Sequence, residues 1–225
     1  MVEDILEEKN YVKKSLHDLW ENLPLLLICN IIFCLLCVPS MIFFMSDLFM
    51  LALWLGCFTV VPTFSGLMYV SGRIANGKSF GVNDMIYGIR HFYGRSLILG
   101  SLIASLISFA IGTSRMLQVT PDQTWLIIPL SIQFAALLFV ALLFAYIFSL
   151  MTMYDISIKK TFIFAFKLAS LYKVPTIGLF SLLVLCALSI RWTKLGLILV
   201  CPIVWAIFAC NTTVLLIQKQ KSPHE

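Results

Sequence analysis

The sequence predicts an all-α fold, a polytopic transmembrane helical bundle of about six spans, and three observations lead to this prediction. Apolar side chains make up 60% of the 225 residues and charged side chains only 12%, which is far outside the composition of soluble domains. Several apolar runs of about 20 residues are each long enough to cross a hydrocarbon core of roughly 30 Å as a helix. These runs are apolar on every face, whereas the strands of a membrane barrel would alternate apolar and polar residues.

The first segment, residues 1–21, is predicted to be an amphipathic interfacial helix. Its apolar residues recur at helical spacing among charged ones, a pattern typical of a helix that lies on a membrane surface. A polar, net acidic stretch from Glu3 to Glu21 precedes the first apolar run. We therefore expect no secretory signal and a first span that is retained.

Residues 22–218 are predicted to form the membrane domain, and residues 219–225 a cytoplasmic tail. Asn22 is expected to cap the first span, and Pro24 is tolerated in the first turn of a helix. The six predicted spans cover residues 22–45, 48–70, 96–114, 125–154, 174–190 and 195–217.

The distribution of basic residues predicts that the N-terminus and the C-terminus are both cytoplasmic. Of the 16 Lys and Arg residues, only Arg115, Arg191 and Lys194 would lie on the far side of the membrane with these spans. Basic residues are enriched on the cytoplasmic side of membrane proteins. The formal charge of +5 is then explained by orientation and by contact with an anionic lipid bilayer. We expect no nucleic-acid partner, because no nucleic-acid-binding motif accompanies the charge.

Two of the predicted cytoplasmic linkers carry amphipathic segments. Residues 82–93 place apolar side chains at i, i+3, i+4 and i+7, which predicts a short helix that can lie flat on the membrane. Residues 156–172 place aromatic and alanine side chains on one face and lysines on another. Each segment fits an interfacial helix, and each also fits a docking surface for a soluble partner. The candidate docking residues are Arg90, Phe92, Tyr93, Lys160 and Lys167.

The residues typical of catalytic, metal-binding or cofactor-binding sites do not form a recognisable motif in this sequence. The three histidines, His17, His91 and His224, have no ligand spacing, and zinc, nucleophile-elbow and phosphate-loop motifs are lacking. All seven cysteines lie in or beside apolar runs, so the Cys34-x-x-Cys37 spacing fits two small apolar residues better than redox chemistry. We expect a protein that is not an enzyme and that holds no cofactor.

Polar residues inside the predicted spans leave one alternative open. No ionisable residue lies near the centre of a span, which argues against proton-coupled transport. Amides and hydroxyls within spans usually hydrogen-bond to neighbouring helices. The alternative is a transporter or permease component whose polar path for a small uncharged solute, such as a sugar, is lined by Asn30, Gln133 and Asn211.

One stretch of the sequence resembles a known family. It comprises Asn22-Leu23, Pro39, Thr59-Val-Val-Pro62-Thr-Phe-Ser-Gly66-Leu-Met-Tyr69, Arg73, Gly77-Lys78 and Tyr87-Gly-Ile-Arg90-His-Phe-Tyr93. This stretch is similar to the YesL family of bacterial integral membrane proteins, a domain of unknown function. Val61 and Thr63 depart from the Thr-x-Gly-Pro-Ala-like turn of that family. The resemblance covers about residues 20–100.

The resemblance implies a location and a role. Members of the family resemble accessory proteins encoded beside carbohydrate-uptake transporters in Gram-positive bacteria. It therefore implies a multi-pass protein of the bacterial cell membrane, acting as an accessory or assembly factor next to an ABC-type sugar transporter subunit. The Glu-Ala-Ala-type loop with which ABC importer permeases grip their ATPase is lacking here, so the chain is not expected to be such a permease.

Overall fold

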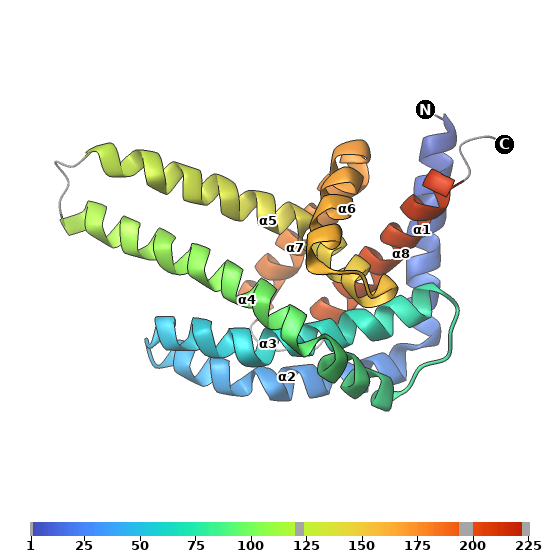
Figure 1. Cartoon of the computed structure of the whole chain (residues 1–225). Helices are drawn as coiled ribbons and strands as arrows, with labels where there is room; N and C mark the ends of the chain where they lie inside the picture. The colour runs from blue at the N-terminus through green and yellow to red at the C-terminus, as the bar shows by residue number, and fades with distance from the viewer. Residues whose placement is uncertain (1, 120–123, 194–199, 222–225) are drawn as a thin grey trace.

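The computed structural model describes residues 2–119, 124–193 and 200–221, and every regular element among them is helical (Figure 1). The all-α prediction is confirmed for this part of the chain. A 3-10 turn, η1 (Thr124–Leu126), precedes α5. The α-helices are α1 (Val2–Glu21), α2 (Leu23–Met45), α3 (Phe49–Ala75), α4 (Val82–Val119), α5 (Ile127–Tyr154), α6 (Ile158–Leu171), α7 (Lys173–Thr193) and α8 (Cys201–Lys221).

Five of these helices are long and apolar enough to cross a bilayer, namely α2, α3, α4, α5 and α8. Helices α6 and α7 pass the same test together, but they are bent by 105° where they meet. The described residues therefore offer five candidate spans, or six if the bent pair is one span. This pattern indicates a multi-pass membrane protein.

Helices α2 to α5 form two antiparallel hairpins that lie side by side (Figure 1). The C-terminal ends of α2 and α4 lie on one side of the bundle. The opposite end holds residues 76–81, which join α3 to α4, and residues 155–157, which join α5 to α6. We call this opposite end the basic end, because Arg73, Lys78 and Arg95 lie on or beside these two connections.

Helix α1 lies across the basic end instead of running along the bundle (Figure 1). Polar contacts tie it to two spans. Lys14 Nζ donates a hydrogen bond to the carbonyl of Ala75 at 3.0 Å, at the last residue of α3. The amide nitrogen of Asn211 in α8 donates to Ser15 Oγ at 3.1 Å and to Asp18 Oδ2 at 3.0 Å. These bonds hold α1 against α3 and α8.

The outer surface of α1 is divided into an apolar and a polar flank. Val12, Leu16 and Trp20 follow one another at four-residue spacing, and all three are exposed. Lys13 and His17 are exposed on the next flank. A helix with one flank on protein, one apolar flank and one charged flank suits the surface of a bilayer. The interfacial position of α1 stays a prediction.

Aromatic side chains fill the centre of the bundle. The ring of Phe64 in α3 lies 5.4 Å from Phe144, 5.3 Å from Phe148 and 5.7 Å from Trp205, measured between ring centroids. Trp205 is only 3% exposed, and its Nε1 donates to the carbonyl of Leu179 at 3.2 Å. Side chains from α3, α5 and α8 therefore meet in one core, with the backbone of α7 bonded to it.

Glycines allow α3 and α4 to approach closely. A Cβ atom added to Gly88 would lie 2.8 Å from Tyr69 Cβ and 3.2 Å from Gly66 Cα. A Cβ atom added to Gly66 would lie 2.9 Å from the carbonyl oxygen of Met85. Small residues are typical of membrane helix pairs, because they let two backbones come together.

The structure differs from the sequence prediction at α4, where a flat helix over 82–93 and a separate span over 96–114 were expected. Helix α4 is continuous over 38 residues, a length of about 57 Å at 1.5 Å per residue. Met85, Phe92 and Ser96 are all buried on one side of it. Because the two segments share this buried face and no proline separates them, they continue in one helical register.

Smaller differences concern the ends of spans. The Asn22 side chain does not cap α2, but donates to the carbonyl of Asp18 at 2.8 Å, while Pro24 lies in the first turn of α2 as predicted. Helix α3 continues to Ala75, beyond the predicted end of the second span. The predicted start of the last span, residue 195, and most of the predicted tail lie outside the described residues; α8 begins at Cys201.

Candidate functional site

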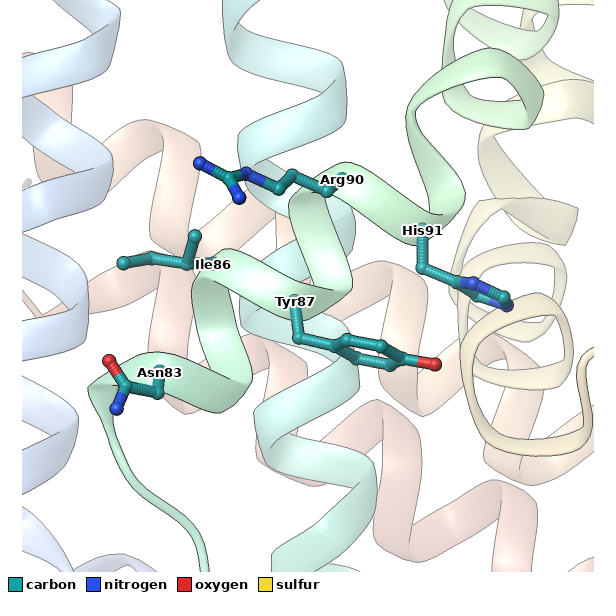
Figure 2. Close-up of a pocket in the computed structure, with 5 residues that line it drawn as sticks. All are labelled: Asn83, Ile86, Tyr87, Arg90 and His91. Atoms are coloured by element: carbon teal, nitrogen blue, oxygen red, sulfur yellow. The ribbon is translucent and has the colours of Figure 1, made fainter.

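The first three turns of α4 carry an open concavity on the side that faces away from α3 (Figure 2). Its volume is about 480 Å³, and it is lined by Asn83, Ile86, Tyr87, Arg90 and His91. Figure 2 shows Asn83, Ile86 and Arg90 pointing to one side of the helix, while Tyr87 and His91 point to the other. We call these five residues the α4 face. It combines a cation, hydrogen-bonding groups and an exposed aromatic ring, which is the composition typical of protein interfaces.

Ring contacts hold the aromatic part of the α4 face in place. The rings of Tyr87 and His91 stack with their centroids 5.3 Å apart and an interplanar angle of 10°. Tyr69 of α3 also contacts Tyr87, with a centroid distance of 5.6 Å. Tyr87 is nevertheless 52% exposed. A side chain that is already ordered loses less conformational entropy when a partner binds.

Asp155 connects the α4 face to the joint between α5 and α6. Arg95 Nη1 donates to Asp155 Oδ1 at 2.5 Å, and His91 Nε2 lies 3.3 Å from Asp155 Oδ2. Arg95 also donates to the carbonyl of Ile156 at 3.4 Å. Asp155 has a φ of 49°, a left-handed conformation that Asp adopts more readily than most residues and that ends α5.

The ion pair changes the titration of Asp155. The hydrogen bond that Asp155 accepts from Arg95 lowers the pKa of this carboxyl below its usual range, and the hydrogen bond that it accepts from His91 acts in the same direction. A carboxyl whose pKa is lower in the folded state stabilises the fold above its unfolded pKa. That stabilisation is lost as the pH falls through the lowered pKa of Asp155.

Asp155→Asn should therefore lower the thermal midpoint of unfolding at pH 7. The decrease should be small, about 2 °C, because the ion pair between Arg95 and Asp155 is partly exposed. Asn tolerates the left-handed conformation, so the substitution removes the charge without straining the backbone. The difference from wild type should shrink as the pH falls from the unfolded pKa of Asp155 through its lowered folded pKa. Thermal unfolding of the purified protein across a pH series measures both effects. Asp47→Asn is the control, because Asp47 also has a positive φ, 58°, but lies at the other end of the bundle.

The predicted docking residues fall on two surfaces. Arg90 and Tyr93 are exposed on α4, and Lys160 and Lys167 are exposed on α6. Phe92 does not belong to a docking surface, because it is only 2% exposed. It lies seven residues after the buried Met85, so it falls on the face of α4 that packs against α3.

The three residues of the predicted polar path make contacts within the bundle. Asn211 binds α1 as described, and Gln133 Nε2 donates to Thr113 Oγ1 at 3.3 Å, between α5 and α4. Asn30 is fully buried in α2. A second open concavity, of about 230 Å³, is lined by Tyr69, Gly72, Arg73, Asn76, Lys78, Thr152 and Met153. The three amide side chains line neither concavity, so the structure adds no support for the transport alternative.

Sequence reasoning missed part of the α4 face. Asn83, Tyr87 and His91 lie at four-residue spacing, and this periodicity could have indicated an exposed stripe of polar and aromatic side chains. No such periodicity in the sequence could have indicated the role of Asp155. Asp155 is 60 residues away from Arg95 in the sequence, and its role depends on how α4 packs beside the end of α5.

The described residues contain no group of three or more His, Cys, Asp or Glu side chains that could hold a metal ion. The seven cysteines are free thiols. No family model matches this chain, and comparisons with curated proteins and with solved structures find no match either.

Proposed function

We propose that this chain is a non-enzymatic accessory or assembly factor of the membrane, and that the α4 face is its docking surface for a partner protein. The observation that carries this proposal is the contrast between the α4 face and the spans. On the α4 face, a cation and an ordered aromatic ring remain exposed. Within the spans, Asn211 and Gln133 donate to other helices of the same chain.

The orientation of the bundle is part of this proposal. Lys14, Arg73, Lys78 and Arg95 lie at the basic end, whereas Arg115 lies near the far end of α4. Because basic residues are enriched on the cytoplasmic side, we place the basic end, and with it the α4 face, in the cytoplasm. Helix α1 would then lie in the cytoplasmic interface of the bilayer.

The nature of the partner is suggested by the resemblance to the YesL family. Tyr87, Arg90 and His91 belong both to the stretch that carries this resemblance and to the α4 face. We therefore propose a subunit of an ABC-type carbohydrate importer in a bacterial cell membrane as the partner. The Arg90 cation favours an acidic patch on that subunit.

Site-specific photo-crosslinking in native membranes tests this function. A photoreactive residue in place of Asn83 should yield an adduct with a transporter subunit. A photoreactive residue in place of Phe109 should not, because Phe109, although 68% exposed, lies in the apolar part of α4, away from the α4 face. Arg90→Glu should reduce the Asn83 adduct at least tenfold, as expected when a central interface charge is reversed.

The matched control for this experiment is Arg115→Glu, which makes the same charge change on the same helix but at the other end of the bundle. It should leave the Asn83 adduct unchanged. Adducts of Asn83 with lipid alone, or an equal loss in both variants, would contradict the docking function.

A further inference from the structure

Helix α6 is oriented across the neighbouring spans. Only Tyr172 separates it from α7, and the two helices are bent by 105°. Figure 1 shows α6 running across the candidate spans α4 and α5, so we expect α6 to lie close to the plane of the bilayer. The length of α6, 14 residues or about 21 Å, is too short to cross the hydrocarbon core by itself.

The flanks of α6 show which way it faces. Thr161, Ala165 and Leu168 are buried on the flank that packs against the bundle. On an adjacent flank, the ring of Phe166 lies 5.9 Å from the ring of Phe139 in α5. Phe139 precedes the end of α5 by about 22 Å along the helix axis, so this flank points towards the apolar middle of the bundle.

Lysines occupy the flank turned away from Phe166. Lys160 and Lys167 are seven residues apart, which places them on one side of the helix, and both are exposed. Ile163, between them, is 67% exposed. Lys159 and Lys173 add two further exposed cations, and α6 itself contains no acidic residue.

The acidic residue nearest in sequence does not neutralise these lysines. Asp155 comes three residues before α6, but its carboxylate is paired with Arg95 and contacts His91. The charged side chains on the outer flank of α6 are therefore all basic, and the exposed apolar side chains of Ile163, Phe164 and Leu171 lie among them. An anionic surface with an apolar layer beneath it is the complementary partner, which is the arrangement of an anionic phospholipid leaflet.

We propose that α6 is a binding element for anionic phospholipid headgroups, with Lys160 and Lys167 on the phosphates and Phe166 in the acyl-chain region. The flexible lysine stems lie along the apolar surface while the ammonium groups reach the headgroups. This site is separate from the α4 face. It reassigns the α6 lysines from protein docking to lipid, and it holds whether or not the α4 face binds a transporter subunit.

Lipid capture by the full chain in vesicles tests the proposal. A photoreactive residue replaces Ile163, and the vesicles contain equal amounts of phosphatidylglycerol and phosphatidylcholine with the same acyl chains. The adducts should favour phosphatidylglycerol by about fivefold for each of the two lysines, the factor that corresponds to about 1 kcal/mol per basic residue near the surface. High salt should reduce the preference, because it screens exposed charges.

Three double variants decide the outcome. Lys160→Gln/Lys167→Gln should bring the adduct ratio close to one, while Lys160→Arg/Lys167→Arg should keep the preference. The matched control, Lys13→Gln/Lys78→Gln, removes the same charge from exposed positions at the basic end and should also keep it. An adduct ratio near one in the wild type, or equal losses in both glutamine variants, would overturn the proposal. Capture of a protein in place of lipid in native membranes would also overturn it.

Discussion

Gly88→Leu is expected to destabilise the protein by about 3 kcal/mol or more, enough to prevent most of it from folding. Even the first side-chain carbon would lie 3.2 Å from the Gly66 Cα, and this neighbour is backbone that cannot rotate away. Helices α3 and α4 would have to separate along their shared face. The yield of monodisperse protein after detergent extraction, together with its thermal midpoint, measures the effect.

Gly94→Leu is the control for this prediction. Gly94 also lies in α4, but a Cβ atom added there would meet nothing within 4 Å. This variant should extract and unfold like the wild type, apart from a small gain in helix propensity. Equal behaviour of the two variants would mean that α3 and α4 do not approach each other through Gly66 and Gly88.

Trp205→Ala should have a similarly large effect, a loss of about 3–5 kcal/mol of stability. The substitution leaves a cavity among Phe64, Phe144 and the neighbouring rings, and it removes the hydrogen bond to the Leu179 carbonyl. Trp205→Phe should keep most of the packing and lose only about 1 kcal/mol with that bond. Equilibrium unfolding in mixed detergent micelles, followed by circular dichroism, separates the two variants.

Trp54→Ala provides the comparison, because Trp54 is 41% exposed on the surface of α3. Its truncation replaces contacts with lipid or detergent and should leave the unfolding curve nearly unchanged. If Trp54→Ala proved as damaging as Trp205→Ala, the aromatic cluster around Phe64 would not be the core that joins α3, α5 and α8.

The helical structure of the long apolar runs could be predicted from the sequence because a bilayer forces the backbone to satisfy its hydrogen bonds within each segment. The predicted spans over 22–45 and 125–154 agree closely with α2 and α5. The continuity of α4 could not be read in this way. The polar residues Asn83, Arg90 and Arg95 interrupt its hydropathy, and only the packing of Met85 and Phe92 on α3 shows that one face is buried throughout.

The candidate site was predictable only in part, for a related reason. Periodicity tells which side chains share a face, and it placed Tyr93 with the apolar side chains of residues 82–93 and Arg90 elsewhere on the same helix. It does not tell which face meets the bundle, and Phe92 was therefore assigned to the wrong surface. The Asp155 contacts depend on which helix ends lie together, and local sequence carries no information about that.

The contacts of α1 impose an order on the biogenesis of this protein. Ser15 and Asn211 are 196 residues apart in the chain. A ribosome makes α1 first, so its inner flank has no α8 to bind while the intervening helices are inserted. During this interval we expect the exposed stripe formed by Val12, Leu16 and Trp20 to hold the segment on the membrane surface. Because α1 can bind Asn211 only after α8 has been made, we expect docking of α1 to be a late step in the folding of the chain.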